Sequence, residues 1–136
     1  MATFNKFQQF VEDVAHKVHN LGSDTITVAL SDTQPVNTNT VIANITELSD
    51  SYVNLSTRNL TLATSAQSSG TYTLDFNDLV LTSTGVTVQF QYVVIYNSTT
   101  GSGNLIGWYD YGAPVNLADG EKFTITFDAL GMVTLV

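Results

Sequence analysis

Cysteine is absent from this chain of 136 residues. Its absence excludes a disulfide framework and thiolate metal sites, and it is typical of a chain that matures in a reducing compartment. Hydrophobic residues still make up 43% of the sequence, so a packed core is available without covalent cross-links. The length predicts one domain over residues 1–136.

Basic residues are also scarce, because four Lys and Arg stand against twelve Asp and Glu, which gives a net charge of −8. Without a basic stripe the chain cannot neutralise phosphates, so we expect no nucleic-acid partner. Anionic membranes should repel it as well. Charged residues reach only 12%, so Thr, Ser, Asn and Gln must build the surface, as is common in extracellular and virion β-proteins.

Long hydrophobic runs are missing. No stretch approaches the ~18 apolar residues of a transmembrane helix, and the first residues lack the basic segment and apolar run of a signal peptide. We therefore expect a soluble protein with no membrane partner.

Residues 3–21 predict one amphipathic α-helix, because apolar residues recur there at gaps of three and four. Thr3 is the expected N-cap, and Gly22 stands where a C′ glycine would end the helix. The apolar stripe consists of Phe4, Phe7, Phe10, Val11, Val14, Val18 and Leu21. We expect it to be buried at Phe7, at Phe10 or Val11, and at Val14 and Val18.

Residues 24–136 change to a period of two and predict roughly eight to ten short strands. Clear alternation marks residues 26–30, 71–76 and 122–127. With no helical pattern between the strands, the fold class is all-β: a jelly-roll-like antiparallel β-sandwich preceded by the N-terminal helix.

The run Val86 to Tyr96 is the longest strand candidate. Its first half alternates, with Val86, Val88 and Phe90 expected to face inward. Its second half, residues 92–96, is apolar on both faces, which indicates a central strand between two buried layers. Further along, Asp119-Gly120 predicts a hairpin turn between residues 115–117 and the strand at Phe123, and Gly131 predicts a tight turn before the last strand.

His16 and His19 are the only histidines, three residues apart on the expected helix and close to Glu12 and Asp13. Two imidazoles and a carboxylate could hold zinc, but there is no third histidine, and the apolar stripe lies on the other side. A solvated polar face with a Glu12–His16 pair is the favoured interpretation.

Catalytic constellations are likewise missing. A serine triad would need a histidine beside a nucleophile elbow, and no G-x-S-x-G occurs. The carboxylate pairs Asp75 with Asp78 and Asp119 with Glu121 lie in expected turns, where Asp has its own backbone role and casual calcium binding stays open. We expect no catalytic residue, no cofactor and no resident metal.

Trp108, Tyr109 and Tyr111 form the densest aromatic cluster. Exposed, the cluster could stack on sugars; alternation along a strand instead favours core packing plus subunit contact. The residues 86–96 and the Trp108 segment supply more apolar surface than one small sandwich hides, so we expect a homo-oligomer, a dimer rather than a trimer. The candidate interface residues are Phe4, Phe7, Trp108, Tyr109 and Tyr111.

Four segments carry a resemblance to a known family: Met1–Asp13, His19–Leu30, Leu105–Gly112 and Leu117–Glu121. They resemble the jelly-roll cement, or decoration, proteins of tailed-bacteriophage capsids. The resemblance implies a non-enzymatic protein, made in the bacterial host cytoplasm, that binds the major capsid protein on the capsid exterior and stabilises the shell. The acidic charge agrees, since packaged DNA would repel it. A tail or neck protein, a carbohydrate- or receptor-binding sandwich and a small hydrolase remain the alternatives.

Overall fold

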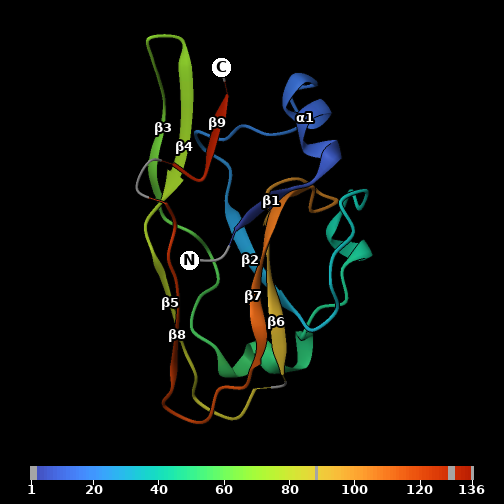
Figure 1. Cartoon of the computed structure of the whole chain (residues 1–136), viewed down its shortest axis with the longest axis vertical. Coiled ribbons are helices and arrows are strands. Elements are labelled where there is room, and N and C mark those ends of the chain that lie inside the picture. Colours follow the sequence, from blue (N-terminus) through green and yellow to red (C-terminus); the bar gives the residue numbers. More distant parts are fainter. Residues whose placement is uncertain (1–2, 88, 129–130, 136) are drawn as a thin grey trace.

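The computed structural model describes residues 3–87, 89–128 and 131–135, without the side chains of residues 49–51. Within them the chain is an antiparallel β-sandwich with one α-helix, α1 (Gln8–Ala15), near its start, which confirms the predicted fold class (Figure 1). The strands are β1 (Phe4–Lys6), β2 (Ile26–Ser31), β3 (Leu62–Ser68), β4 (Thr71–Phe76), β5 (Leu79–Thr82), β6 (Phe90–Asn97), β7 (Leu105–Val115), β8 (Lys122–Ile125) and β9 (Val133–Leu135).

One layer of the sandwich is a four-stranded sheet in the order β1-β7-β6-β2. The other layer consists of two shorter sheets, β3-β4-β9 and β5-β8, which lie one above the other in Figure 1. The chain passes from β4 into β5 and from β8 towards β9, and a hydrogen bond joins the two connections, because the Phe127 amide donates to Asp78 Oδ1 at 3.0 Å. The two short sheets therefore continue one another.

The two predicted glycine turns have different outcomes. Gly131 has a φ of +110° and donates its amide to the Asp128 carbonyl just before β9, as expected. Gly120 also sits in a turn, with a φ of +84°. The predicted hairpin around it is wrong, however, because β7 ends at Val115 and β8 pairs with β5 in the other layer. The turn carries the chain between layers.

Both faces of the four-stranded sheet are buried. Val93 and Ile95 of β6 enter the main core between the layers, whereas Val94 enters a smaller core on the outer face, covered by residues 32–48. This confirms that residues 92–96 form a central strand between two buried layers. In the first half of that prediction, Phe90 does face inward and is fully buried. The prediction is wrong for Val86, which is 75% exposed and precedes β6, and Val88 lies outside the described residues. The smaller core contains Phe7, Ala29, Ile45, Val94, Leu105 and Trp108.

The predicted helix over residues 3–21 is too long at its start. Phe4–Lys6 form β1, which pairs with β7 in the register Lys6↔Gly107. A Cβ at Gly107 would lie 2.2 Å from Phe4 Cε2, so the glycine makes room for the Phe4 ring. Phe7, rather than Thr3, occupies the N-cap position. Sheet pairing by the first residues therefore overrides their helical spacing.

The helix also ends early, at Ala15. The Val18 amide donates to the Asp13 carbonyl at 2.9 Å and the Lys17 amide to the Val14 carbonyl at 3.3 Å, the two bonds of a Schellman motif. Lys17 takes the left-handed position of that motif, with a φ of 64°, where Gly22 had been expected to act.

Burial along the predicted apolar stripe is uneven. Phe7 and Phe10 are fully buried, as expected. Val14 and Val18 are only half-buried, and Val11 is 54% exposed. A helix of eight residues presents fewer side chains to the core than the predicted one, and Val18 has already left it.

Candidate functional site

The aromatic cluster lies inside the molecule. Trp108 is 6% exposed and Tyr109 is 4% exposed, on opposite faces of β7. Trp108 packs in the smaller core with its ring centroid 6.0 Å from that of Tyr92, and its Nε1 donates to Asn37 Oδ1 at 3.1 Å. Tyr109 packs in the main core against Phe127. A flat sugar-stacking surface is therefore not available at these two residues.

The other three candidate interface residues differ in how much of their surface is exposed. Phe7 is fully buried, so Phe7, Trp108 and Tyr109 each fill a core of their own chain and offer little surface to a partner in this conformation. Phe4 and Tyr111 are half-buried and keep part of their surface. Most of the apolar surface from which an oligomer was inferred is thus hidden within one copy, with Val86 as an exposed exception, and an oligomer stays a prediction.

Burial also alters the phenol chemistry of the cluster. It raises the pKa of Tyr111 to about 12, and it raises the pKa of Tyr109 further, with the neighbouring Tyr111 and the Asp128 and Asp75 carboxylates adding to the effect. Both hydroxyls therefore stay protonated near neutral pH, and neither can serve as a general base.

The two histidines are separated by the end of α1. His16 has a 65% exposed side chain and lies with Nδ1 3.8 Å from Glu12 Oε1, which confirms the predicted Glu12–His16 pair. His19 lies beyond the Schellman motif and is buried, which corrects the expectation of a shared solvated face. The early end of the helix turns His19 inward, and a helix continuing to residue 21 would not have done so.

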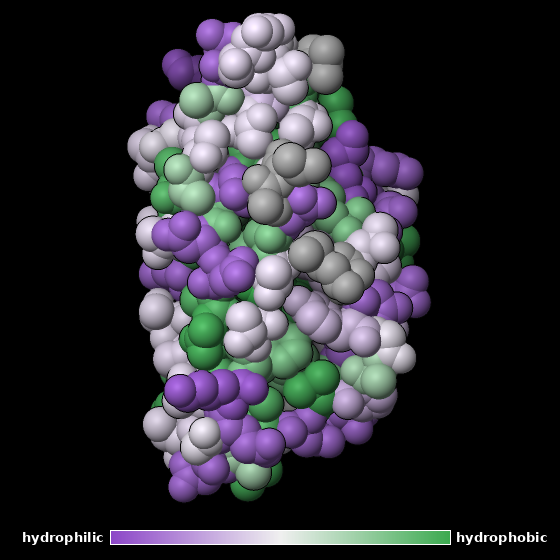
Figure 2. All heavy atoms as spheres, turned by 60° about the vertical axis from the view of Figure 1, so that its left-hand side comes forward, coloured by the Kyte–Doolittle hydropathy of each residue, from purple (hydrophilic) through white to green (hydrophobic). Residues whose placement is uncertain are grey.

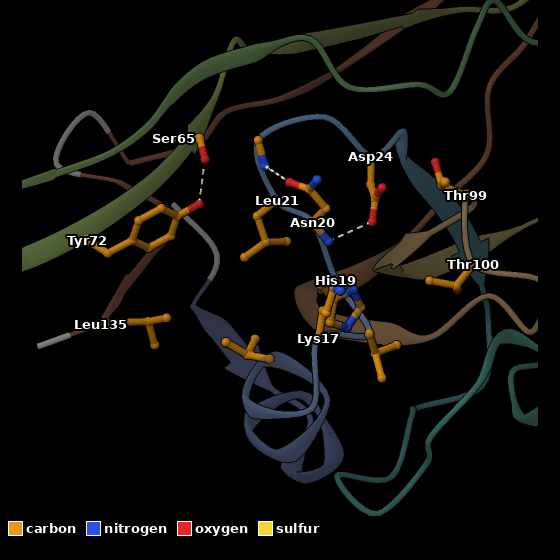
Figure 3. Close-up of a pocket in the computed structure, with 13 residues that line it drawn as sticks. Lys17, His19, Asn20, Leu21, Asp24, Ser65, Tyr72, Thr99, Thr100 and Leu135 are labelled. Carbon is orange, nitrogen blue, oxygen red and sulfur yellow. Dashed lines mark hydrogen bonds between the residues drawn. The ribbon is translucent and has the colours of Figure 1, made fainter.

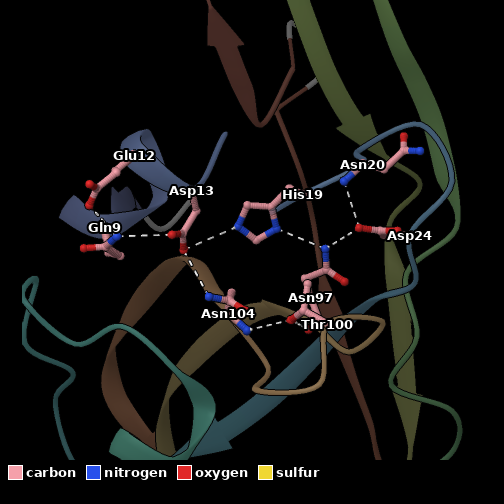
Figure 4. Close-up of polar contacts among 9 residues, drawn as sticks. All are labelled: Gln9, Glu12, Asp13, His19, Asn20, Asp24, Asn97, Thr100 and Asn104. Carbon is pink, nitrogen blue, oxygen red and sulfur yellow. Dashed lines mark hydrogen bonds and ion pairs between the residues drawn. The ribbon is translucent and has the colours of Figure 1, made fainter. Parts of the chain in front are cut away.

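His19 belongs to a buried polar cluster with Asp13, Asn97, Asp24 and Asn104 (Figure 4). Asn97 Nδ2 donates to Asp24 Oδ2 at 2.7 Å and faces His19 Nδ1 at 3.0 Å. Because Asp24 is an acceptor, the amide group must point its hydrogens this way, and His19 Nδ1 must accept. The imidazole proton is therefore on Nε2.

Asp13 closes the other side of the cluster. Its Oδ2 accepts from Asn104 Nδ2 at 3.2 Å, and its Oδ1 accepts from Gln9 Nε2 at 3.1 Å. His19 Nε2 lies 4.0 Å from Asp13 Oδ2, which is longer than a hydrogen bond. Burial lowers the pKa of His19, although the Asp13 and Asp24 carboxylates oppose the shift. The imidazole is therefore neutral, and the cluster ties α1, residues 19–24 and the β6–β7 connection together.

The carboxylates considered as pairs in the sequence lie in different local surroundings. Asp75 lies in β4 rather than in a turn, and Asp78 accepts the Phe127 amide. Glu121 Oε1 accepts the Ala118 amide at 2.6 Å within its own turn. Among the described residues, no group of three or more His, Asp or Glu side chains is arranged to hold a metal ion. The described helices include none that is long and apolar enough to span a membrane.

An open groove of about 750 Å³ lies where the end of α1 and residues 17–24 face β3, β4 and β9 (Figure 3). Its apolar lining includes Val14, Leu21 and Leu135, and the Ser65 and Tyr72 hydroxyls are joined at 2.7 Å beside them. Lys17 also lines it. The sequence did not indicate this groove, because its walls come from five separate segments.

A second surface feature, which we call the valine tip, consists of Val53 and Val86. Val53 is 83% exposed and Val86 is 75% exposed. Their loops are held together, since Asn54 Nδ2 donates to the Val86 carbonyl at 3.3 Å and the Thr84 amide donates to the Asn54 carbonyl at 2.7 Å. The segment of residues 49–54, which carries Val53, runs along the lower end of Figure 1, away from α1.

Comparison with protein-family models, with curated proteins and with solved structures gives no match for this chain.

Proposed function

We propose that the chain is a non-enzymatic virion structural protein that binds the outer surface of a bacteriophage capsid and stabilises the shell. The non-enzymatic part of the proposal rests on the structural roles of the buried aromatic and polar side chains. The buried aromatic residues fill the two cores, and the buried Asp13, His19 and Asn97 are engaged by hydrogen bonds to other side chains of the same chain. Of the titratable groups that line the open groove, Asp24 accepts a hydrogen bond from Asn97 and Tyr72 shares one with Ser65, so both are engaged within the chain.

The charge and surface of the molecule support the capsid exterior as its place. A net charge of −8 disfavours contact with packaged DNA. Binding to the assembled lattice alone would raise the stability of that lattice by mass action, without any catalytic step. The sugar-binding alternative loses its support, since Trp108 and Tyr109 are buried.

The valine tip is the contact that we assign to the capsid protein. Two large apolar side chains with most of their surface exposed are costly to leave in water, and burial of each would contribute about 1 kcal/mol or more. They stand on neighbouring loops that are hydrogen-bonded to each other, so one partner surface can contact both loops.

Co-sedimentation with capsids assembled without the chain tests this proposal. The wild-type chain should sediment with the capsids, and a double variant Val53→Asp and Val86→Asp should remain in the supernatant while keeping its melting temperature. Val11→Asp is the matched control, because Val11 is 54% exposed but belongs to α1. Failure of the wild-type chain to bind would overturn the proposed function. Equal binding by the double variant would overturn only the role of the valine tip.

A further inference from the structure

β3 is an open edge of the sandwich. It is the outer strand of the sheet β3-β4-β9, and its hairpin with β4 stands at the upper end of Figure 1. All seven of its residues are exposed except Ser65, which is half-buried. The outer edge of β2 is different, because the Val28 amide donates to the Arg58 carbonyl and the Leu60 amide to the Ile26 carbonyl. No described segment covers β3 in this way.

The turn between β3 and β4 determines which backbone amides and carbonyls of β3 point away from β4. Ser69 and Gly70 have φ values of 51° and 83°, the signature of a two-residue type I′ hairpin. Such a turn makes Ser68 and Thr71 a hydrogen-bonded pair, so Ser68, Ala66 and Thr64 bond to β4 in alternation. Ser65 and Gln67 therefore direct their amides and carbonyls away from β4, and neither bonds by its backbone to another described segment.

β3 lacks the devices by which proteins prevent edge pairing. Residues 62–68 contain no charged residue and no proline, and the one irregularity of register lies at its start, between Leu62 and Thr64. In Figure 2 the upper end of the molecule is mostly pale, the colour of residues of intermediate hydropathy. Two chains with a net charge of −8 repel each other, and a strand without charge is where they approach at least cost.

We propose that two copies of the chain associate by antiparallel pairing of their β3 strands. Pairing that uses both free residues of each copy sets Ser65 opposite Gln67 of the second copy and places Ala66 on the two-fold axis. Ala66 then meets its counterpart in a pair without backbone hydrogen bonds, the kind in which side chains approach most closely, and its methyl group is small enough to fit. The three-stranded sheets of the two copies join into one. This inference does not rest on the proposed capsid role.

Variants with one introduced cysteine test the proposed register of the β3–β3 pair, because the wild-type chain contains no cysteine. Across the two-fold axis the Cα atoms of residue 66 would be about 4.5 Å apart, within reach of a disulfide. Under mild oxidation the Ala66→Cys variant should become a covalent dimer. Ser68→Cys is the matched control on the same strand: its counterpart would lie about 13 Å away along the strand. A mixture of Thr64→Cys and Ser68→Cys chains should cross-link between unlike partners.

Sedimentation of the chain in solution gives the second measurement. The wild-type chain should self-associate with rising concentration, and Ala66→Lys should weaken the association roughly fivefold, because like charges would face each other. Ala66→Ser should leave it unchanged, and Gln67→Pro should also weaken it by removing an outward amide. A wild-type chain that stays monomeric, or Ala66→Cys and Ser68→Cys chains that cross-link equally, would overturn the proposal. Neither result bears on capsid binding, which is measured separately.

Discussion

Asn97 Nδ2 approaches His19 Nδ1 to 3.0 Å across 78 positions of sequence, and the same amide nitrogen donates to Asp24. This contact joins the segment after α1 to the end of β6 at a site where the two side chains are almost wholly buried. It fixes the imidazole in its neutral form, because a proton on Nδ1 would meet an amide donor.

The His19 contact predicts a pH dependence of stability. Burial lowers the pKa of His19 below the 6.5 of an unfolded histidine. As pH falls below about 6.5, the unfolded chain takes up a proton that the folded chain does not, so the free energy of unfolding decreases. Urea unfolding of the wild-type chain between pH 8 and pH 5 should show this decrease.

The matched variants are His19→Gln and His16→Gln. Replacement of His19 should flatten the pH dependence near pH 6, whereas replacement of the exposed His16 should preserve it, because the buried imidazole remains. A wild-type slope retained by His19→Gln would show that other groups are responsible.

Lys17 predicts a stabilising substitution. It holds the left-handed position of the Schellman motif with a φ of 64°, which costs a side-chain-bearing residue about 1 kcal/mol. Lys17→Gly should therefore raise the free energy of unfolding by up to about 1 kcal/mol. Lys17→Ala removes the same charge without relieving the backbone and should give no such gain. Equal effects of the two substitutions would assign the change to charge instead.

Trp108 reports on the smaller core through its fluorescence, because it is the sole tryptophan. With 6% of its surface exposed, it should emit at short wavelength and be poorly quenched by iodide. Saccharides should leave the spectrum unchanged. Trp108→Ala should destabilise the fold by about 3–5 kcal/mol, since it empties a packed site. A saccharide-dependent spectral shift would restore the sugar-binding interpretation.

Phe7 and Val11 separate the buried and exposed sides of the N-terminal segment. Phe7 is fully buried in the smaller core, so Phe7→Ala should cost about 3–5 kcal/mol. Val11→Ala at its exposed position should change the free energy of unfolding by less than about 0.5 kcal/mol. Urea unfolding of both variants measures the difference. A large loss at Val11 would indicate that the helix packs by its predicted stripe.

The sequence was sufficient for the fold class and for the central strand, because alternation and a doubly apolar run depend only on local pattern. It failed at residues 3–21, where gaps of three and four fit a helix but Phe4–Lys6 gain more from pairing with β7. A lysine in the left-handed region has no sequence signal, so the early end of α1 and the burial of His19 were missed.

The surface features were beyond sequence reasoning for another reason. The aromatic cluster was recognised, but whether Trp108 faced solvent depended on residues 32–48 folding over it, a long-range contact without local pattern. The groove and the valine tip are assembled from segments distant in sequence. The open edge of β3 follows only from strand order, which places β4 and not β3 in the middle of its sheet.

Particle stability tests the proposed capsid role most directly. Phage particles assembled with and without the chain would be heated, and the temperature at which DNA is released would be recorded for each. The account predicts that particles lacking the chain rupture at a lower temperature, and that adding back wild-type protein restores the higher one, whereas the double variant Val53→Asp and Val86→Asp does not. Equal rupture temperatures for depleted and complete particles would contradict it.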